Sequence, residues 1–498
     1  MPEHPKRPSY HGGDTPKSQD RSIRKAFRRL NIGTIHDTVI RNFRPYITGA
    51  RPMPTVAMKK GLGLNITGEP GPNVETVTGF DRIGVVPERI PFVKPKLHVA
   101  EGETVRRGSL LFTDKRNPDI RFVSPAGGTV KAIDFGPRRV IRAIVIDVDK
   151  EEACESVDPL SEKKISAIQK SDLAALLMKA GLWPFLRALP FRDMADPSGD
   201  PPAIIVNLEA LDPFHPGPLV YLEGAADFFK LGMSALFRLA PRVMVAASPE
   251  TSTRLTILAP LISHTVTGPY PADDPGVLLY YTRTSQADNR SWYIHGADVV
   301  LLGEFLKTGC FPVHRVVAVS TPTVRYYCRT RIGAPLARLA PGLDKADTIQ
   351  IMAGGLWRGQ RVSAGSFLGM HETAVTALPD GKVSEFLGFL RPGTNKPTRS
   401  KAFLSRLRKS PLPMDAGMHG EERACVNCGT CATVCPVDIL PQFTVKAVLA
   451  GEVEESLAHG LLDCVECGLC AYVCPSKIEL TEHLKTARQA YYMETTAP

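Results

Sequence analysis

Two stretches near the C-terminus decide the fold of the most distinctive part of this chain. They read Cys425-Val-Asn-Cys428-Gly-Thr-Cys431-Ala-Thr-Val-Cys435-Pro436 and Cys464-Val-Glu-Cys467-Gly-Leu-Cys470-Ala-Tyr-Val-Cys474-Pro475. Both have the spacing C-x₂-C-x₂-C-x₃-C-P. Three cysteines at this spacing wrap a turn around three corners of an iron–sulfur cube, while the fourth, on the helix that follows, reaches another cube. The two stretches therefore predict a domain that holds two [4Fe–4S] clusters.

The predicted ligation is crossed between the two motifs. One cluster would be held by Cys425, Cys428, Cys431 and Cys474, and the other by Cys464, Cys467, Cys470 and Cys435. A pair of zinc sites is the alternative, but zinc ribbons use two close cysteine pairs per metal, and each quartet here ends in a proline. Between the motifs, Gln442–His459 has a helical pattern, which favours the helical type of two-cluster domain over a compact ββαβ ferredoxin.

Length and cysteine usage indicate a multidomain protein that is not exported. A chain of 498 residues is too long for one core, so three or four domains are expected. No apolar run approaches the ~18 residues that cross a bilayer, and no signal peptide is expected. Eight of the 11 cysteines lie in the two motifs, and the other three, Cys154, Cys310 and Cys328, are expected to be isolated and structural. Such clustering favours metal binding over a disulfide framework.

The formal charge of +10 is concentrated at the N-terminus. Residues 1–60 hold 13 Lys and Arg against 4 Asp and Glu, so the basicity belongs to a tail, and nucleic acid is not an expected partner. Residues 20–33 predict a short amphipathic helix with Ile23, Phe27 and Leu30 on one face. This helix could pack on its own protein, but docking to a partner subunit or an anionic membrane surface is favoured.

The middle of the chain shows three successive patterns. Residues 60–147 are rich in short strands, at 83–87, 109–113 and 140–148, with Gly and Pro between them. Residues 165–320 alternate between helical and strand patterns, which indicates an α/β domain with a mainly parallel sheet. The helices are expected at Ile165–Ala180, Pro218–Leu239 and Ala297–Leu306, and the strands at Ala203–Leu208, Val243–Ala247 and Val316–Ser320. Residues 321–395 return to short strands and Gly-rich turns, as in a small α+β module.

Two known families share parts of this sequence. The stretches Gly460-Leu-Leu-Asp-Cys-Val-Glu-Cys-Gly-Leu-Cys-Ala-Tyr-Val-Cys-Pro-Ser476 and Cys435-Pro-Val-Asp-Ile-Leu-Pro441 resemble the cluster domain of the Rnf C subunits, which belong to the ferredoxin:NAD oxidoreductases. Roughly residues 55–400 are more similar to the Nqr A subunits of the sodium-translocating NADH:quinone reductases (Nqr). The matching segments are Lys60-Gly-Leu-Gly-Leu-Asn-Ile-Thr-Gly68, His98-Val-Ala-Glu-Gly-Glu-Thr-Val, Leu111-Phe-Thr-Asp-Lys115, Ser124-Pro-Ala-Gly-Gly-Thr-Val130, Ala180-Gly-Leu-Trp-Pro-Phe-Leu-Arg187 with Pro190-Phe191, and Trp292-Tyr-Ile-His-Gly-Ala-Asp298.

These resemblances imply a multidomain architecture of α/β and β units. The expected units are a basic N-terminal extension with a short amphipathic helix (1–55), a barrel-sandwich hybrid domain (56–150), a Rossmann-like α/β domain (160–320), a soluble-ligand-binding β-grasp module (321–395), a linker (396–420) and a helical two-[4Fe–4S] domain of ferredoxin type (421–488). Typical Nqr A subunits lack the two cysteine quartets, so the last unit departs from the family pattern.

The chain departs from the Rnf C pattern at one loop. Rnf C subunits carry Gly-Gly-Ala-x-Phe-Pro, which cradles FMN, whereas the corresponding place here is residues 181–191. Trp183, Pro184 and Phe185 replace the glycines that let backbone N–H groups approach a phosphate. We therefore expect neither FMN nor NADH to bind at this loop. A quinone site is a weaker implication of the family. Trp183, Phe185 and Phe191 could line it, but apolar core packing is the favoured use of all three.

Other motifs are expected to be structural. Lys115 stands where a lipoyl domain carries its modified lysine, but nothing suggests a catalytic partner pocket, so a surface lysine is expected. The turn Gly354–Gly359 could bind an anion, yet Gly-rich turns of this kind are common in β-grasp modules. The histidines are scattered and form no H-E-x-x-H pattern. No catalytic residue is therefore assigned to this chain.

The predicted function is that of a peripheral, cytoplasmic electron-transfer subunit on the inner face of the cell membrane. It would belong to a membrane-bound Nqr-like complex and relay single electrons between a reduced donor and the membrane subunits, without being catalytic alone. The donor could be a ferredoxin or a flavin-containing subunit that oxidises NADH. Two alternatives stay open: an Rnf C-like subunit with FMN and NADH sites, and a scaffold whose clusters are structural only.

Overall fold

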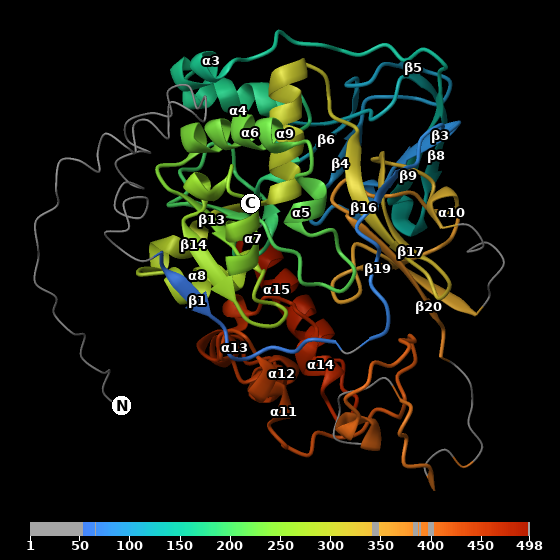
Figure 1. The fold of residues 1–498 in the computed structure, drawn as a ribbon, viewed down its shortest axis with the longest axis vertical. Helices are drawn as coiled ribbons and strands as arrows, with labels where there is room; N and C mark the ends of the chain where they lie inside the picture. Colours follow the sequence, from blue (N-terminus) through green and yellow to red (C-terminus); the bar gives the residue numbers. More distant parts are fainter. Residues whose placement is uncertain are drawn as a thin grey trace, which may run out of the picture. The chain divides into compact units, whose positions relative to one another are not determined.

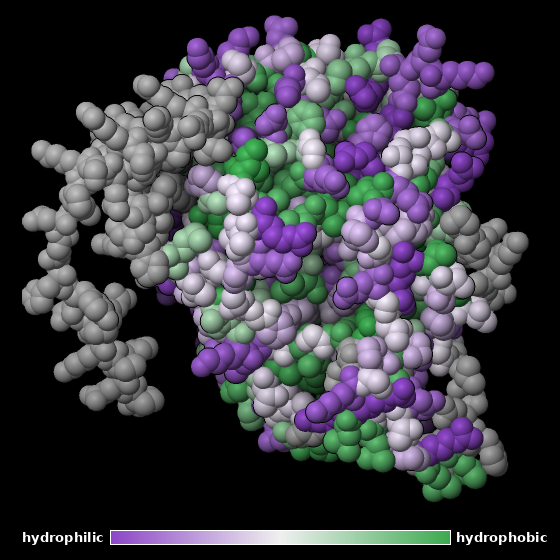
Figure 2. Space-filling model, viewed as in Figure 1, coloured by the Kyte–Doolittle hydropathy of each residue, from purple (hydrophilic) through white to green (hydrophobic). Residues whose placement is uncertain are grey.

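The computed structural model describes residues 53–64, 66–340, 348–381, 387, 390–396 and 403–496 (Figure 1). The chain divides into two compact units, Met1–Met53 and Pro54–Pro498, and the elements below belong to the second. The amphipathic helix expected within residues 20–33 lies outside the described residues. No helix in the described part of the chain is long and apolar enough to cross a membrane. Figure 2 shows hydrophilic and hydrophobic side chains interspersed on one face.

Two small antiparallel sheets form a β-rich domain. One has the strand order β3 (Arg82–Val85), β9 (Ile141–Val148), β8 (Gly128–Phe135), β5 (Thr104–Val105), and the other β4 (Pro95–Leu97), β6 (Leu110–Asp114), β7 (Asn117–Val123). The predicted strands at 83–87, 109–113 and 140–148 are confirmed as β3, β6 and β9. Ile83, Leu111 and Ile144 are fully buried, so the inward positions of these strands give the domain its own core.

A seven-stranded, mainly parallel sheet forms the centre of the α/β domain. Its strand order is β1 (Thr55–Ala57), β14 (His264–Thr267), β13 (Val243–Ala247), β12 (Ile204–Asn207), β15 (Trp292–His295), β10 (Arg187–Ala188), β11 (Asp193–Met194). The first five strands pair in parallel, and β10 and β11 are antiparallel. All residues of β12 and β13 are buried, as expected for strands of a parallel sheet that is covered on both faces. The strands predicted within 203–208 and at 243–247 are confirmed.

The helices of this domain differ in part from the prediction. They are α3 (Glu162–Ala167), α4 (Lys170–Lys179), α5 (Pro218–Tyr221), α6 (Ala226–Leu239), α7 (Pro249–Arg254), α8 (Pro275–Thr282) and α9 (Gly296–Thr308). The single helix predicted at Ile165–Ala180 is wrong, because Ile168 and Gln169 are extended between α3 and α4. The helix predicted at Pro218–Leu239 is also broken, near Gly224, whose φ of +69° is left-handed. The helix predicted at 297–306 is confirmed as α9.

A six-stranded sheet contains the next part of the chain. Its strand order is β19 (Gln360–Val362), β18 (Ile349–Ala353), β20 (Ala374–Pro379), β16 (His314–Ser320), β17 (Arg325–Arg331), β2 (Val74–Thr76), and α10 (Leu336–Leu339) follows β17 in the chain. The predicted strand at Val316–Ser320 is present as β16, but it does not join the α/β sheet. The turn at 321–324 makes β16 and β17 an antiparallel hairpin, and this local pairing assigns β16 to the six-stranded sheet.

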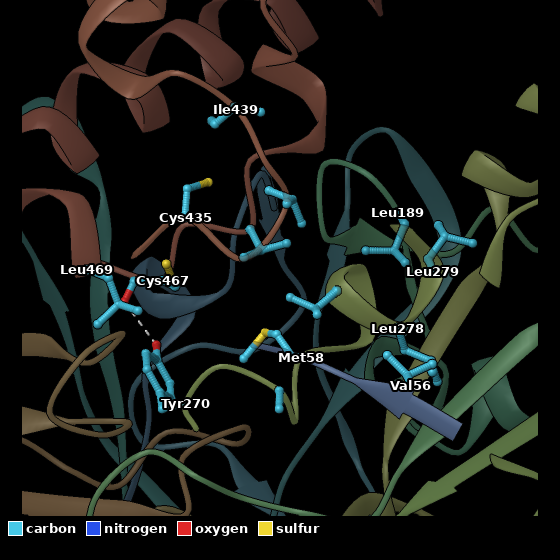
Figure 3. Close-up of a cluster of buried hydrophobic side chains, with 14 of the residues drawn as sticks. Val56, Met58, Leu189, Tyr270, Leu278, Leu279, Cys435, Ile439, Cys467 and Leu469 are labelled. Carbon is cyan, nitrogen blue, oxygen red and sulfur yellow. Dashed lines mark hydrogen bonds between the residues drawn. The ribbon is translucent and has the colours of Figure 1, made fainter. Parts of the chain in front are cut away.

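The C-terminal domain is helical, as predicted. Its helices are α11 (Thr430–Val434), α12 (Pro441–Ala450), α13 (Val453–Ala458), α14 (Leu469–Tyr472) and α15 (Leu480–Thr495). The helix predicted at Gln442–His459 is broken, because Gly451 ends α12 with a left-handed φ of +77°. One buried cluster joins this domain to the α/β domain, and Figure 3 shows Cys435, Cys467 and Leu469 in the same cluster as Met58 and Tyr270. The cysteine-rich domain therefore shares a core with the α/β domain.

Candidate iron–sulfur centres and the adjoining cavity

The two cysteine motifs have the same backbone conformation. The residue before the second cysteine, Asn427 or Glu466, has a left-handed φ, and so has the glycine before the short helix, Gly429 or Gly468. In each motif the third cysteine lies on that helix, α11 or α14, and the fourth lies shortly after the helix ends. Left-handed residues in such turns direct successive backbone N–H groups into a concavity, as in many iron–sulfur sites. The equal spacing of the motifs in the sequence thus corresponds to an equal loop geometry.

The four thiols of the predicted second set lie close enough to affect one another's ionisation. Burial, and next the thiols of Cys464 and Cys435, raise the pKa of Cys467 to about 12. Burial, next the Cys467 thiol, and then those of Cys464 and Cys435 raise the pKa of Cys470 well above its ordinary value. All four cysteines line one small cavity. Cys435 of the first motif therefore lies among three cysteines of the second.

Two hydrogen bonds connect the segment before Cys425 with the segment after Cys474, the first and last cysteines of the predicted first set. The Arg423 N–H donates to the Ser476 carbonyl at 2.9 Å, and the Ser476 hydroxyl donates to the Ala424 carbonyl at 3.0 Å. The residues just before the first cysteine therefore lie beside those just after the last. Two cysteines of this set are exposed and two are buried: Cys425 and Cys428, and Cys431 and Cys474.

The chemistry of the donor set fits an iron–sulfur cluster. Buried thiols with raised pKa values ionise only when a positive charge compensates the thiolates, and iron supplies that charge. Polar side chains also reach the sulfurs: Gln442 contacts Cys431 at 3.0 Å and Thr481 contacts Cys470 at 3.4 Å. No three His, Cys, Asp or Glu side chains of the described residues are arranged to hold a metal ion. Both ligand sets therefore stay predictions.

Two aromatic residues from outside the motifs, Tyr270 and Trp357, contact the second motif. The Tyr270 hydroxyl donates to the Cys467 carbonyl at 3.0 Å (Figure 3). The Tyr270 ring stacks on Trp357 with their centroids 5.5 Å apart, and Trp357 meets Tyr472 edge-on at 4.9 Å. Sequence reasoning missed this group because its members come from three parts of the fold, and no local pattern connects them.

The loop at 181–191 is filled by its own side chains. Trp183, Pro184 and Phe185 form one short turn of 3-10 helix and are all buried. The Trp183 indole N–H donates to the Ala195 carbonyl at 2.7 Å, so core packing is confirmed for this residue. Phe191 differs, because its ring is half-buried and packs on Tyr492 with the centroids 4.7 Å apart. Phe185 and Phe191 both line a large cavity.

This cavity has a volume of about 960 Å³ and lies where all four folded parts of the described chain meet. Its walls include Arg89 from the β-rich domain, Arg187 from β10, Arg358 beside β19, and Val465 and Glu466 from the second cysteine motif. Pockets for small organic ligands have volumes of this order. The second motif thus borders a space that is large enough for a ligand.

A buried carboxylate, that of Asp274, pairs with two arginines of the cavity wall, Arg192 and Arg358. Asp274 accepts hydrogen bonds from Arg192 at 2.9 Å and forms an ion pair with Arg358 at 2.7 Å. Burial raises the pKa of two neighbouring carboxyls, Asp212 and Asp273, to about 6. Asp274 is thus the carboxylate that forms direct ion pairs with both guanidinium groups.

The turn Gly354–Gly359 does bind an anion, but the anion belongs to the protein itself. The Leu356 N–H donates to the Asp212 carboxyl at 3.1 Å. A Cβ atom on Gly355 would lie 2.4 Å from the same carboxyl, so only glycine fits there. The structural use of this turn, which the sequence favoured, is confirmed.

Two cysteines outside the motifs are paired. Cys154 and Cys310 form a disulfide with their Cα atoms 6.3 Å apart. The expectation that they are isolated is therefore wrong. The pair is separated by 156 residues and has no spacing that sequence analysis could recognise. Cys328 is buried on β17, and burial raises its pKa to about 12, which fits a structural thiol.

Comparison with known proteins covers most of the chain. Residues 56–149 match the NqrA N-terminal barrel-sandwich hybrid domain, 168–311 the NqrA second alpha/beta domain, 316–364 the NQRA C-terminal domain, and 424–478 a 4Fe-4S dicluster domain. One solved structure, an NAD+-reducing [NiFe]-hydrogenase in the H2-reduced state, aligns at 10% identity with a TM-score of 0.32, over 68% of this chain and 63% of that one. That similarity is too low to carry an argument.

Several curated relatives are the Nqr A subunits of Na(+)-translocating NADH-quinone reductases. The protein of Pasteurella multocida is 30% identical over 412 residues, and that of Saccharophagus degradans is 31% identical over 413 residues. Each alignment spans 82% of this chain and 92% of the relative. The resemblance drawn from the sequence motifs is thereby confirmed, and the chain belongs to the NqrA family of the Na(+)-translocating NADH-quinone reductases, with a C-terminal 4Fe-4S dicluster domain in addition.

Proposed function

We propose that this chain is a peripheral electron-transfer subunit of a membrane-bound, Nqr-like oxidoreductase and relays single electrons through two [4Fe–4S] clusters. The observation that carries the proposal is the unequal exposure of the two motifs. All four cysteines of the predicted second cluster are at least half-buried and line one small cavity of their own, whereas Cys425 and Cys428 are exposed. One cluster would lie in the interior of the protein and the other at its surface. An electron relay needs such an arrangement, because one cluster must be accessible to an external donor or acceptor.

The ligands proposed for the clusters are those that the motifs predict. Cys425, Cys428, Cys431 and Cys474 hold one cluster, and Cys464, Cys467, Cys470 and Cys435 hold the other. The bound clusters supply reversible one-electron chemistry. The protein contributes burial, the N–H groups of the two loops, and Thr481 and Gln442 near the sulfurs. No residue of this chain makes or breaks a bond.

The finer fold assignments belong to the same proposal. We take residues 160–320, which supply most of the seven-stranded sheet, as Rossmann-like, and residues 321–395, which supply most of the six-stranded sheet, as a soluble-ligand-binding β-grasp. Strand β1 joins the first sheet, and β2 and β16 join the second, from outside these ranges. The barrel-sandwich hybrid spans 56–150 and the two-cluster domain spans 421–488. The basic extension 1–55 and the linker 396–420 complete the chain, and the extension docks it to a partner subunit or to the membrane.

The names of the relatives and the filled loop at 181–191 support the partners that we propose for this chain. Membrane subunits of an Nqr-like complex accept or deliver the electrons, and the chain lies on the cytoplasmic face of the membrane. Trp183 and Phe185 fill the place where a flavin phosphate would approach the backbone. No FMN is therefore expected here, and the donor is a one-electron carrier such as ferredoxin or a flavin-containing subunit that oxidises NADH.

Crossed cysteine variants test the proposal. The intact chain should bind about eight irons as two four-iron cubes. The Cys435→Ser substitution should damage the cluster of the second motif, and Cys474→Ser that of the first, as followed by iron content and electron paramagnetic resonance. Cys328→Ser, a buried cysteine outside the motifs, is the matched control and should keep all the iron. Damage confined in each case to the cluster of the substituted motif would overturn the crossed arrangement.

A further inference from the structure

A groove on the C-terminal helical domain is separate from the two cysteine motifs. It has a volume of about 410 Å³ and lies between α15 on one side and the turn from α12 to α13 on the other. No cysteine of the described residues lines it, and it shares one lining residue, Glu482, with the large cavity. Neither the proposed clusters nor the large cavity therefore accounts for this groove.

The floor of this groove is apolar and open to solvent. Its apolar lining residues come from both sides: Val448, Val453, Leu461, Ala487 and Ala490. Val453 is 50% exposed although it is apolar, and Ala490 is exposed as well. An apolar concavity that stays exposed commonly marks a surface for interaction with another protein.

The sequence period of α15 explains why the groove is not filled. Leu480, Leu484 and Arg488 recur every four residues, and their side chains are buried on one face of the helix. Ala487 and Ala490 lie three residues apart on another face, where their small side chains leave space above the helix. A second helix therefore has room to approach α15 closely along this face.

Carboxylates surround this apolar floor. Glu479 directly precedes α15, Glu482 lies in its first turn and Glu494 lies near its end, and all three line the groove and are exposed. None of them forms an ion pair with a described residue. No Lys or Arg of the described chain lines the groove, and His483 is the one basic side chain among the lining residues.

The opposite side of the groove adds charge of the same sign. Three more exposed glutamates lie at the start of α13, beside the lining residue Val453: Glu452, Glu454 and Glu455. The groove thus combines an apolar floor with a negatively charged rim on both sides. Such a surface is complementary to an apolar stripe that is flanked by Lys or Arg.

We propose that this groove is the docking site for a basic amphipathic helix of a partner subunit. The apolar stripe of that helix lies on Ala487, Ala490 and Val453, and its Lys or Arg side chains contact the glutamates of the rim. From Glu479 to Glu494 the chain advances by about 22 Å, at ~1.5 Å per residue, which matches roughly four turns of a partner helix. The same carboxylates repel an anionic membrane surface, so a protein is the favoured occupant. Docking here requires no electron relay and goes beyond the function proposed above.

The test measures binding of model peptides to the full-length, iron-loaded chain by fluorescence anisotropy. The probe is a labelled helical peptide of about 18 residues with leucines on one face and lysines on the others. A second peptide has glutamate in place of each lysine, and a third has the composition of the probe in scrambled order. The probe should bind in a 1:1 ratio and at least tenfold more tightly than either control. Equal binding of the glutamate peptide would overturn the charge complementarity, and equal binding of the scrambled peptide would overturn the apolar stripe.

Variants of α15 then locate the site. Ala490→Arg places a long cationic side chain on the floor of the groove and should weaken binding of the probe at least tenfold. Gln489→Arg adds the same side chain at the neighbouring exposed position, which does not line the groove, and should change the dissociation constant less than threefold. Equal effects of the two variants would refute this location. Should Ala490→Arg fail to fold by circular dichroism, the double variant Glu479→Gln/Glu494→Gln takes its place, and unchanged binding in that folded variant would count against the site.

A segment of this chain is the other possible occupant, because residues 20–33 predict a basic amphipathic helix. The probe is therefore also titrated into the chain without residues 1–33. If the groove serves a partner subunit, the full and the shortened chain should bind the probe with dissociation constants within threefold of each other. Binding at least tenfold tighter to the shortened chain would overturn the proposal and assign the groove to the segment that was removed.

Discussion

The hydrogen bond between Tyr270 and the second cysteine motif allows a quantitative test of how the two-cluster domain is held. The Tyr270→Phe substitution removes the hydroxyl that donates to the Cys467 carbonyl at 3.0 Å, with little change in shape. Because Tyr270 is only 3% exposed, water cannot replace the lost donor. The net value of such a bond is about 0.5–1.5 kcal/mol, and an unsatisfied buried carbonyl costs about 1–3 kcal/mol. The expected loss of stability is therefore about 1–3 kcal/mol.

A second tyrosine provides a matched control. The Tyr281 hydroxyl donates to the Pro436 carbonyl, also at 3.0 Å, but this side chain is 42% exposed. After Tyr281→Phe, water can satisfy the carbonyl, so the loss should stay below about 0.5 kcal/mol. The two variants remove the same group from the same kind of bond and differ mainly in burial.

The assay is urea unfolding followed by tryptophan fluorescence. Trp357 stacks on Tyr270, so its emission reports on this contact between domains. A multidomain chain need not unfold in one step, so the two variants are compared at the transition in which the Trp357 signal changes. A midpoint for Tyr270→Phe equal to or higher than that for Tyr281→Phe would refute the reasoning.

The remaining predictions concern titration, electron donors and attachment. Because burial raises the pKa of Asp273 to about 6, its contribution to stability is complete below the unfolded pKa of about 3.9 and is lost as the pH rises through about 6. Asp273→Asn should therefore flatten the fall in the unfolding midpoint between about pH 4 and 7, and unchanged profiles would contradict this assignment. NADH should not bleach the iron–sulfur absorbance of the purified chain, since hydride transfer delivers two electrons and a cube accepts one; bleaching within seconds, with FMN recovered, would restore the Rnf C-like alternative. Deleting residues 1–33 should leave the iron content intact and release the chain from its complex, and retention of the full chain should fall as salt rises. Retention that does not change with salt would show that attachment is not electrostatic.

Local patterns predicted much of the fold. The buried strand at Val243–Ala247 and the helix around Ala297–Leu306 are present because a continuous apolar run and a helical period each specify one element. The helix errors lie where a few residues leave the helical conformation. Gly451 ends α12 with a left-handed φ, left-handed Gly224 lies between α5 and α6, and extended Ile168 and Gln169 separate α3 from α4. Strand β16 was predicted to belong to the α/β sheet but lies in the six-stranded sheet, because β17, its hairpin partner, follows it directly in the chain.

The candidate site was predictable only where its residues are close in sequence. Spacing alone located the eight cysteines, and the left-handed loops around them agree with the repeat. The contact of Tyr270 with Cys467 depends on how distant segments pack, and no sequence period signals such a contact. The Cys154–Cys310 pair was missed for the same reason.

The most direct test of the central proposal is a redox titration of the iron-loaded chain, monitored by electron paramagnetic resonance. The relay predicts about eight irons per chain and two clusters that both become paramagnetic on one-electron reduction at potentials that physiological donors reach. Their signals should interact magnetically, because crossed ligation holds the two cubes close together. Four irons or fewer per chain, or clusters that stay oxidised at those potentials, would contradict the relay and leave a structural role for the cysteine-rich domain.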